Sequence, residues 1–196
     1  MSDWKFRTIV ADPPWSYRTP RAGAKGRSGA ASKYPVMKLN AIKAIPIDQI
    51  AARDAVLFLW ATVPMLPEAF EVLAAWGFKY KTSVFWHKVG RFGMGWWFRG
   101  AVEVCLVGAR GKAKALRCQK PNIIEAWPRE HSRKPDEFFD LIDPVTPGPK
   151  VELFARAKRD GWFSWGNEIN RDFWFAVQEH FGFMEDPAQG LLGLQD

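Results

Sequence analysis

The sequence predicts an α/β protein in which helices cover both faces of a mostly parallel β-sheet. Its strand candidates are apolar throughout, as expected of strands that are buried on both faces. They alternate along the chain with segments of helical periodicity. The chain has 196 residues, 47% of them hydrophobic. This is enough for a substantial core, and we expect a single domain over residues 1–196.

The individual elements follow from local patterns in chain order. Short runs of β-branched and aromatic residues predict strands at 7–11, 55–60, 80–87, 102–108, 123–127 and 150–155. Apolar residues at helical spacing predict helices at 47–53, 65–76, 135–142 and 171–182. Gly77 suits the end of the second helix, and Pro135 suits the first turn of the third. Cys105 is expected to be buried in its strand.

The first strand ends in an unusual tetrapeptide, Asp12-Pro13-Pro14-Trp15. Neither proline has an N–H to donate, so the sheet ladder stops there. An Asp-Pro pair alone is most simply interpreted as a plain turn after a strand.

The same tetrapeptide suits the transfer of a methyl group to the exocyclic amine of adenine. The lone pair of that nitrogen is delocalised into the ring, so an enzyme must hold its two hydrogens. The Asp12 carboxylate and the Pro13 carbonyl are candidate acceptors, and both bind more strongly as positive charge develops on the nitrogen. Trp15 is a candidate stacking surface for the base.

Positive charge is concentrated in three spans without an acidic residue, 13–47, 72–102 and 104–124. The formal net charge is +7 and the pI is about 9.5. This balance favours a nucleic-acid partner, because phosphate contacts supply most non-specific affinity. A generic solubilising surface is the alternative. The candidate nucleic-acid contacts are Arg18, Lys25, Arg27, Lys88, Arg91, Trp97 and Arg133.

Two segments break the alternation, and we expect mobile loops near 18–33 and 88–100. The first is basic and rich in glycine and other small residues, and the second carries four glycines together with several aromatic residues. Basic residues interleaved with aromatics bind single bases and backbones. For the second loop, a hydrophobic flap packed on its own domain is the alternative. Both loops should lie near the carboxyl ends of strands, where open α/β sheets bind ligands.

Several classes of protein are disfavoured by what the sequence lacks. It has no membrane-spanning apolar run and no apolar signal region, so we expect a cytoplasmic protein without a membrane partner. Two cysteines and three scattered histidines predict no metal site. The glycine-rich dinucleotide fingerprint, the P-loop and the G-x-S-x-G elbow are all missing.

The D-P-P-W tetrapeptide resembles the signature of the MT-A family of adenine N6-methyltransferases. Other segments resemble the family in order: 33–37 (KYPVM), 56–62 (VLFLWAT), 103–111 (EVCLVGARG), 131–137 (HSRKPDE) and 151–168 (VELFAR to WGNE). The resemblance covers about residues 7–168. It implies a Rossmann-like class I methyltransferase fold with a permuted motif order, in which the methylation signature precedes the cofactor segment.

The resemblance also implies roles at the substrate side of the site. Asp12 and Pro13 would hold the adenine amine, and Pro14 and Trp15 would shape the pocket. Tyr34 would contact the target base.

The resemblance implies S-adenosylmethionine as cofactor, with Asp12 near its methionine part. Lys134 would reach the cofactor carboxylate, although a helix-flanking surface lysine is the alternative. Arg156 would contact the ribose or shape its site, and Asn167 and Glu168 would bind the adenine or ribose. Departures from the family pattern occur at Ala155, Lys158 and Arg159.

The expected activity is therefore methyl transfer to the N6 amine of adenine. DNA is the preferred substrate because so short a chain is similar to the bacterial and phage members, and RNA is the alternative. A non-catalytic nucleic-acid-binding subunit is less favoured, because such subunits lose the acid or the cofactor contacts. Since no separate target-recognition domain is visible, we expect a homodimer in which the second copy helps to grip the nucleic acid.

Overall fold

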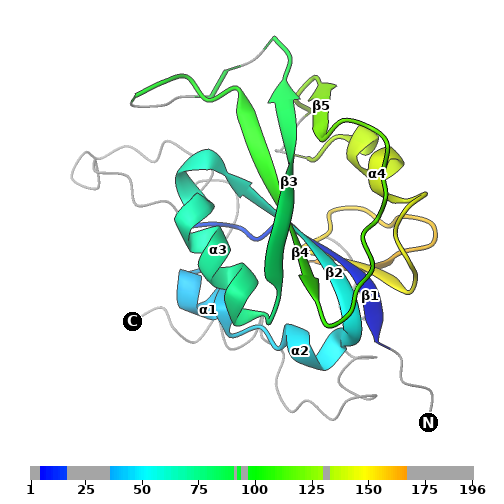
Figure 1. Cartoon of the computed structure of the whole chain (residues 1–196). Helices are drawn as coiled ribbons and strands as arrows, with labels where there is room; N and C mark the ends of the chain where they lie inside the picture. Colours follow the sequence, from blue (N-terminus) through cyan, green and yellow to red (C-terminus); the bar gives the residue numbers. More distant parts are fainter. Residues whose placement is uncertain (1–4, 17–35, 91, 94–96, 130–132, 167–196) are drawn as a thin grey trace.

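The computed structural model describes residues 5–16, 36–90, 92–93, 97–129 and 133–166. Within them lies a seven-stranded sheet of order β5-β3-β4-β2-β1-β6-β7 (Figure 1). The strands are β1 (Phe6–Ala11), β2 (Ala51–Thr62), β3 (Lys79–Lys88), β4 (Val102–Arg110), β5 (Ile123–Ala126), β6 (Lys150–Leu153) and β7 (Phe163–Trp165). The helices are α1 (Leu39–Lys43), α2 (Ile47–Ile50), the 3-10 turn η2 (Val63–Met65), α3 (Leu66–Ala75) and α4 (Asp136–Ile142). None of these described helices is long and apolar enough to cross a membrane.

Helices cover both faces of the sheet, as the sequence predicts. Figure 1 shows α1 and α3 on one side and α4 on the other. Ile42 of α1 and Leu57 of β2 belong to the buried cluster on the first face. On the second face Phe138 of α4 packs edge-to-face on Phe58 and Trp60, with ring centroids 5.8 and 4.9 Å away. Successive residues of 55–61 in β2 alternate between the two clusters, which explains why this part of the strand is apolar throughout.

Strand directions agree with the prediction except at β4. Parallel pairs join β1 to β2 and β6, β3 to β5, and β6 to β7. The fourth strand runs antiparallel to both of its neighbours, β2 and β3. The connection between β3 and β4 is a hairpin, in which Gly93 and Gly100 pair through their backbones. A parallel arrangement would need a crossover, usually through a helix, and no helix occurs in the described part of 89–101.

Some predicted boundaries were wrong. The helix expected at 47–53 ends at Ile50, because β2 already begins at Ala51, which pairs with Phe6 of β1. The short helix α1 and the short edge strand β7 were not predicted. The helix expected at 171–182 and the loop near 18–33 lie outside the described residues.

Replacing Phe138 with alanine should lower the free energy of unfolding by about 3–5 kcal/mol, because removal of its fully buried ring leaves a cavity between α4 and the sheet. Chemical denaturation measures this loss. Phe98, which is 87% exposed, supplies the control, and Phe98→Ala should change stability by less than about 0.5 kcal/mol. Equal losses in the two variants would contradict the assignment of Phe138 to the buried cluster between α4 and the sheet.

Candidate active site

The candidate site lies at the end of the sheet where β1, β2 and β3 reach their carboxyl ends and β4 begins. Asp12 follows β1, which is flanked on both sides by the parallel strands β2 and β6. Because β4 is antiparallel, its second residue, Glu103, pairs with Thr62 at the end of β2 and with Trp86 near the end of β3. The antiparallel strand β4 therefore brings a second acid, Glu103, to the end of the sheet at which β1 ends.

The ammonium group of Lys134 lies at the centre of the site and contacts two carboxylates. It bonds to Oδ2 of Asp12, and it lies 3.4 Å from Oε2 of Glu103. Lys88, at the end of β3, bonds to the other oxygen of Glu103. The side chain of Lys134 is only 12% exposed, so the surface-lysine alternative was wrong. We call these four side chains the ion cluster.

Burial and mutual contact decide the protonation of the ion cluster. Burial raises the pKa of Asp12, and Lys134 opposes this only in part. Burial would also raise the pKa of Glu103, but Lys134 and Lys88 outweigh it and the pKa lies below its usual value. Burial disfavours the charged form of Lys134, but the two carboxylates outweigh it and raise its pKa. Glu103 and Lys134 therefore both stay charged near neutral pH.

A cleft opens beside the ion cluster on the face that α4 covers. It is lined by Val10, Asp12, Trp60, Arg133, Lys134, Phe139, Glu152, Phe154, Arg156, Ala157, Lys158 and Arg159. Glu152 lies on β6, and burial raises its pKa to about 7, although Arg159 opposes the shift. The motif comparison gave Glu152 no role. The available signal was a single acid among the apolar residues of the segment 151–155.

The rim of this cleft carries an excess of positive charge. Asp136, in the first turn of α4, contacts three guanidinium groups, with N–O distances of 2.6 Å to Arg129, 3.8 Å to Arg133 and 3.1 Å to Arg159. The guanidinium of Arg159 also lies 3.6 Å from the ring centroid of Phe139. Three cations around one carboxylate leave a net positive rim that suits an anionic ligand.

The tetrapeptide turn differs from the prediction at Trp15. Its ring is only 6% exposed, packs in the cluster on the α1 face, and donates its indole N–H to the Trp60 carbonyl. The prediction that Trp15 stacks on the substrate base was therefore wrong. The Pro14 carbonyl accepts from the N–H of Met37, and the Pro13 carbonyl accepts from the N–H of Trp15 itself. A carbonyl oxygen has two lone pairs, so Pro13 retains one acceptor position.

The other predicted site residues fall into three groups. Lys88, Lys134, Arg133 and Arg156 lie at the ion cluster or the cleft. Trp97 is 92% exposed on the β3–β4 hairpin, so the packed-flap alternative was wrong for this ring. The residues outside the described part of the chain are Arg18, Lys25, Arg27, Tyr34, Arg91, Asn167 and Glu168.

Cys105 is fully buried in β4, as the sequence predicts. Burial raises the pKa of its thiol well above the usual value. The thiol is therefore neutral at physiological pH and is not a nucleophile.

Comparison with known proteins places this arrangement among the α/β methyltransferases. The sequence model of the MT-A70 family matches residues 6–168. The chain is 33% identical over 187 residues to the type II methyltransferase M.MunI from Mycoplasma sp, covering 84% of this chain and 78% of that protein. The chain therefore belongs to the MT-A70 family.

Plant and animal relatives match over a similar part of this chain. The catalytic subunit METTL3 of the N(6)-adenosine-methyltransferase of Homo sapiens is 30% identical over 180 residues, and an MT-A70-like N(6)-adenosine-methyltransferase of Arabidopsis thaliana is 30% identical over 175. These matches cover 85% and 84% of this chain but only 28% and 24% of the relatives. The chain thus spans about a quarter of their length.

Replacing Glu103 with glutamine should lower the free energy of unfolding by about 3–5 kcal/mol, because Lys88 then loses its carboxylate partner and Lys134 keeps only Asp12. Adding Lys88→Met should recover part of this loss, as measured by chemical denaturation. Glu125→Gln, which removes a 68% exposed partner of His87, is the control and should change little. Strictly additive losses in the double variant would contradict the ion cluster.

Glu152→Gln should flatten the dependence of stability on pH. The folded protein holds the Glu152 proton up to a pKa of about 7, whereas the unfolded chain releases it near 4.5. The contribution of Glu152 is therefore greatest below about pH 4.5 and falls as the pH rises to about 7, by at most about 1.4 kcal/mol per pH unit. Denaturation of both proteins across this range measures the difference. A difference that is constant or increases with pH would refute the assignment.

Proposed function

We propose that this protein transfers the methyl group of S-adenosylmethionine to the exocyclic N6 amine of adenine in DNA. The observation that carries the proposal is the position of Asp12. It directly follows the internal strand β1, it bonds to the buried Lys134, and it lines a charged cleft. An acceptor held in place before the substrate arrives stabilises charge that develops in the transition state.

Two acceptors of the tetrapeptide turn suit the two hydrogens of the adenine amine. Lys134 occupies Oδ2 of Asp12, and no described residue bonds to Oδ1. The Pro13 carbonyl follows one residue later and retains one lone pair. Burial raises the pKa of Asp12, which makes its carboxylate a stronger proton acceptor as the amine becomes cationic. These groups would orient the amine and stabilise its developing charge.

The residues of the cleft fit the chemistry of S-adenosylmethionine, which supplies an electrophilic methyl group when it is bound. Lys134 has three N–H donors, of which Asp12 and Glu103 take two, so one can serve the cofactor carboxylate. The carboxylate of Glu152 suits the cofactor ammonium group. The buried indole N–H of Trp60 has no hydrogen-bond partner among the described residues, which leaves a donor at the cleft wall. Arg156, which also lines the cleft, would contact the ribose.

DNA is favoured over RNA by similarity to the Mycoplasma type II methyltransferase, to which the chain is 33% identical. The adenosine methyltransferases of Homo sapiens and Arabidopsis thaliana are 30% identical, and RNA is the alternative substrate. Lys88, Arg133 and Trp97 are the described candidates for contacts with the nucleic acid. The homodimer, and the contacts of Tyr34, Asn167 and Glu168, stay predictions.

Asp12→Ala should lower methyl transfer by at least about 100-fold and leave the fold intact. Transfer of label from radiolabelled S-adenosylmethionine to duplex DNA, single-stranded DNA and RNA measures the effect, and digestion identifies N6-methyladenine. Asp48→Ala, which removes an exposed acid on α2, is the matched control.

Full activity of Asp12→Ala would refute the proposed mechanism. Label on RNA alone would retain the mechanism and change the substrate. No transfer by a wild-type protein that binds S-adenosylmethionine in calorimetry would indicate a non-catalytic subunit.

A further inference from the structure

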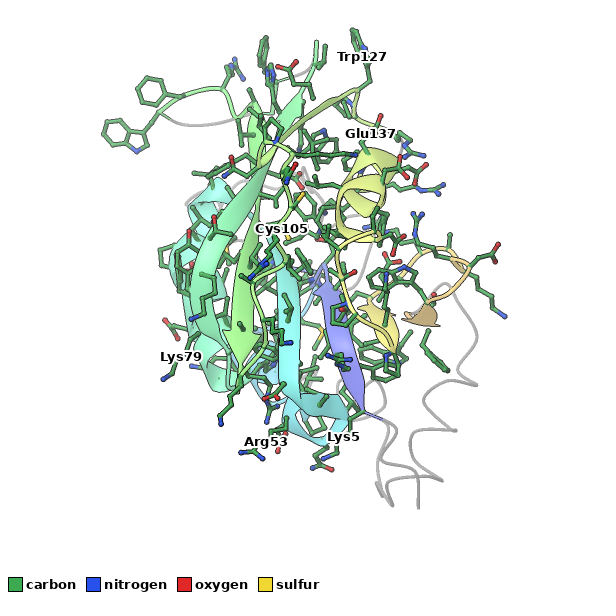
Figure 2. The ribbon with its side chains drawn as sticks, turned by 45° about the vertical axis from the view of Figure 1, so that its right-hand side comes forward. Lys5, Arg53, Lys79, Cys105, Trp127 and Glu137 are labelled. Carbon is green, nitrogen blue, oxygen red and sulfur yellow. The ribbon has the colours of Figure 1, made fainter. Side chains whose placement is uncertain are left out.

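Trp127 is an exposed aromatic residue at the site end of the molecule that no motif singles out. It follows β5 directly, and 68% of its surface is exposed. Figure 2 shows it beyond α4, pointing away from the sheet. The cores that hold the sheet together do not include it. A single exposed ring is common on protein surfaces, so the case for a ligand depends on how this ring is held and on the charges near it.

The backbone around Trp127 holds its ring in a defined place. The Ala126 carbonyl accepts hydrogen bonds from the Val89 N–H, at 3.2 Å, and from the indole N–H of Trp86, at 3.0 Å. The ring lies directly against Gly90, where an added Cβ would come within 2.3 Å of it. Pro128 restricts the backbone of Trp127 to extended conformations. One part of the indole is therefore fixed, and the remainder faces solvent.

Charged groups flank Trp127 on both sides. Gly90, against which the ring rests, comes two residues after Lys88 of the ion cluster. Arg129 comes two residues after Trp127 and belongs to the arginines around Asp136. Two residues span at most about 7 Å of backbone, so the backbone of Lys88 passes near the ring and that of Arg129 lies near Trp127. Net positive charge beside an exposed ring is the combination with which proteins bind single-stranded nucleic acid.

We propose that Trp127 is a stacking platform for an unstacked nucleobase of the strand that carries the target adenine. The proposal rests on the proposed function, because a base must leave its helix to reach the cleft and its neighbours then lose a stacking partner. The signature tryptophan, Trp15, does not offer this surface because it is buried. The arginine-rich rim supplies the phosphate contacts that position the strand, and the ring binds a base face irrespective of sequence.

The test separates base stacking from phosphate binding. Fluorescein-labelled oligodeoxyadenylate and an abasic deoxyribose-phosphate strand of equal length are titrated with each protein, and anisotropy gives Kd. Trp127→Ala should weaken binding of oligodeoxyadenylate by about 5-fold to 150-fold and leave binding of the abasic strand unchanged. Trp127→Phe should recover most of the affinity. Tyr80→Ala, at the opposite end of β3 and 46% exposed, is the matched control and should match the wild type.

Two results would overturn the proposal. One is that Trp127→Ala binds oligodeoxyadenylate with unchanged affinity. This includes the case in which light scattering shows that the variant has lost a contact between protein chains while its affinity for the oligonucleotide is unchanged. The other is an equal loss on both strands. The methyl-transfer assay keeps the two proposals distinct. If Trp127→Ala loses affinity for oligodeoxyadenylate alone but the wild-type protein never methylates, only the proposed function is overturned. If the wild-type protein methylates and Trp127→Ala keeps its affinity, only the stacking platform is overturned.

Discussion

The contact of one buried ammonium group with two carboxylates is the interaction on which the site depends. Lys134 precedes α4, Asp12 follows β1 and Glu103 is the second residue of β4, so three distant parts of the chain meet at one point. Two acids this close and this buried would repel each other without the cation. A cation this buried would lose its proton without the acids. Lys134 stabilises the charge of both carboxylates and both carboxylates stabilise the charge of Lys134, so the fold must bring all three together.

The same cluster connects the cleft with the surface that we propose binds nucleic acid. Lys88 bonds to Glu103 and lies at the base of the β3–β4 hairpin, which Figure 1 shows projecting beyond the sheet. Gly90 continues from Lys88 and supports the ring of Trp127. The acceptor Asp12 and the exposed aromatic residues are thus attached to one set of paired charges. Such a connection keeps catalytic groups in register with a bound strand at little cost in reorganisation.

The tryptophans in the described part of the chain differ in burial and therefore in role. Trp60 and Trp86 are fully buried and pack against each other edge-to-face, with ring centroids 6.5 Å apart. Trp15, although part of the signature, belongs to the core and fixes the tetrapeptide turn through its bond to the Trp60 carbonyl. Trp97 and Trp127 stay in water at the site end. Sequence motifs do not make this distinction, because the side chain is the same in every case.

The α/β class, the strand that leads into Asp12 and the family could be predicted from the amino-acid sequence, because they depend on local periodicity and on short motifs. The sequence also identified Lys134 as a site residue, but only through the resemblance. Tertiary structure alone decided the direction of β4, the two partners of Lys134, the burial of Trp15 and the raised pKa of Glu152. The physical reason is that pairing, charge compensation and desolvation depend on which distant residues meet, and that is a property of the folded chain.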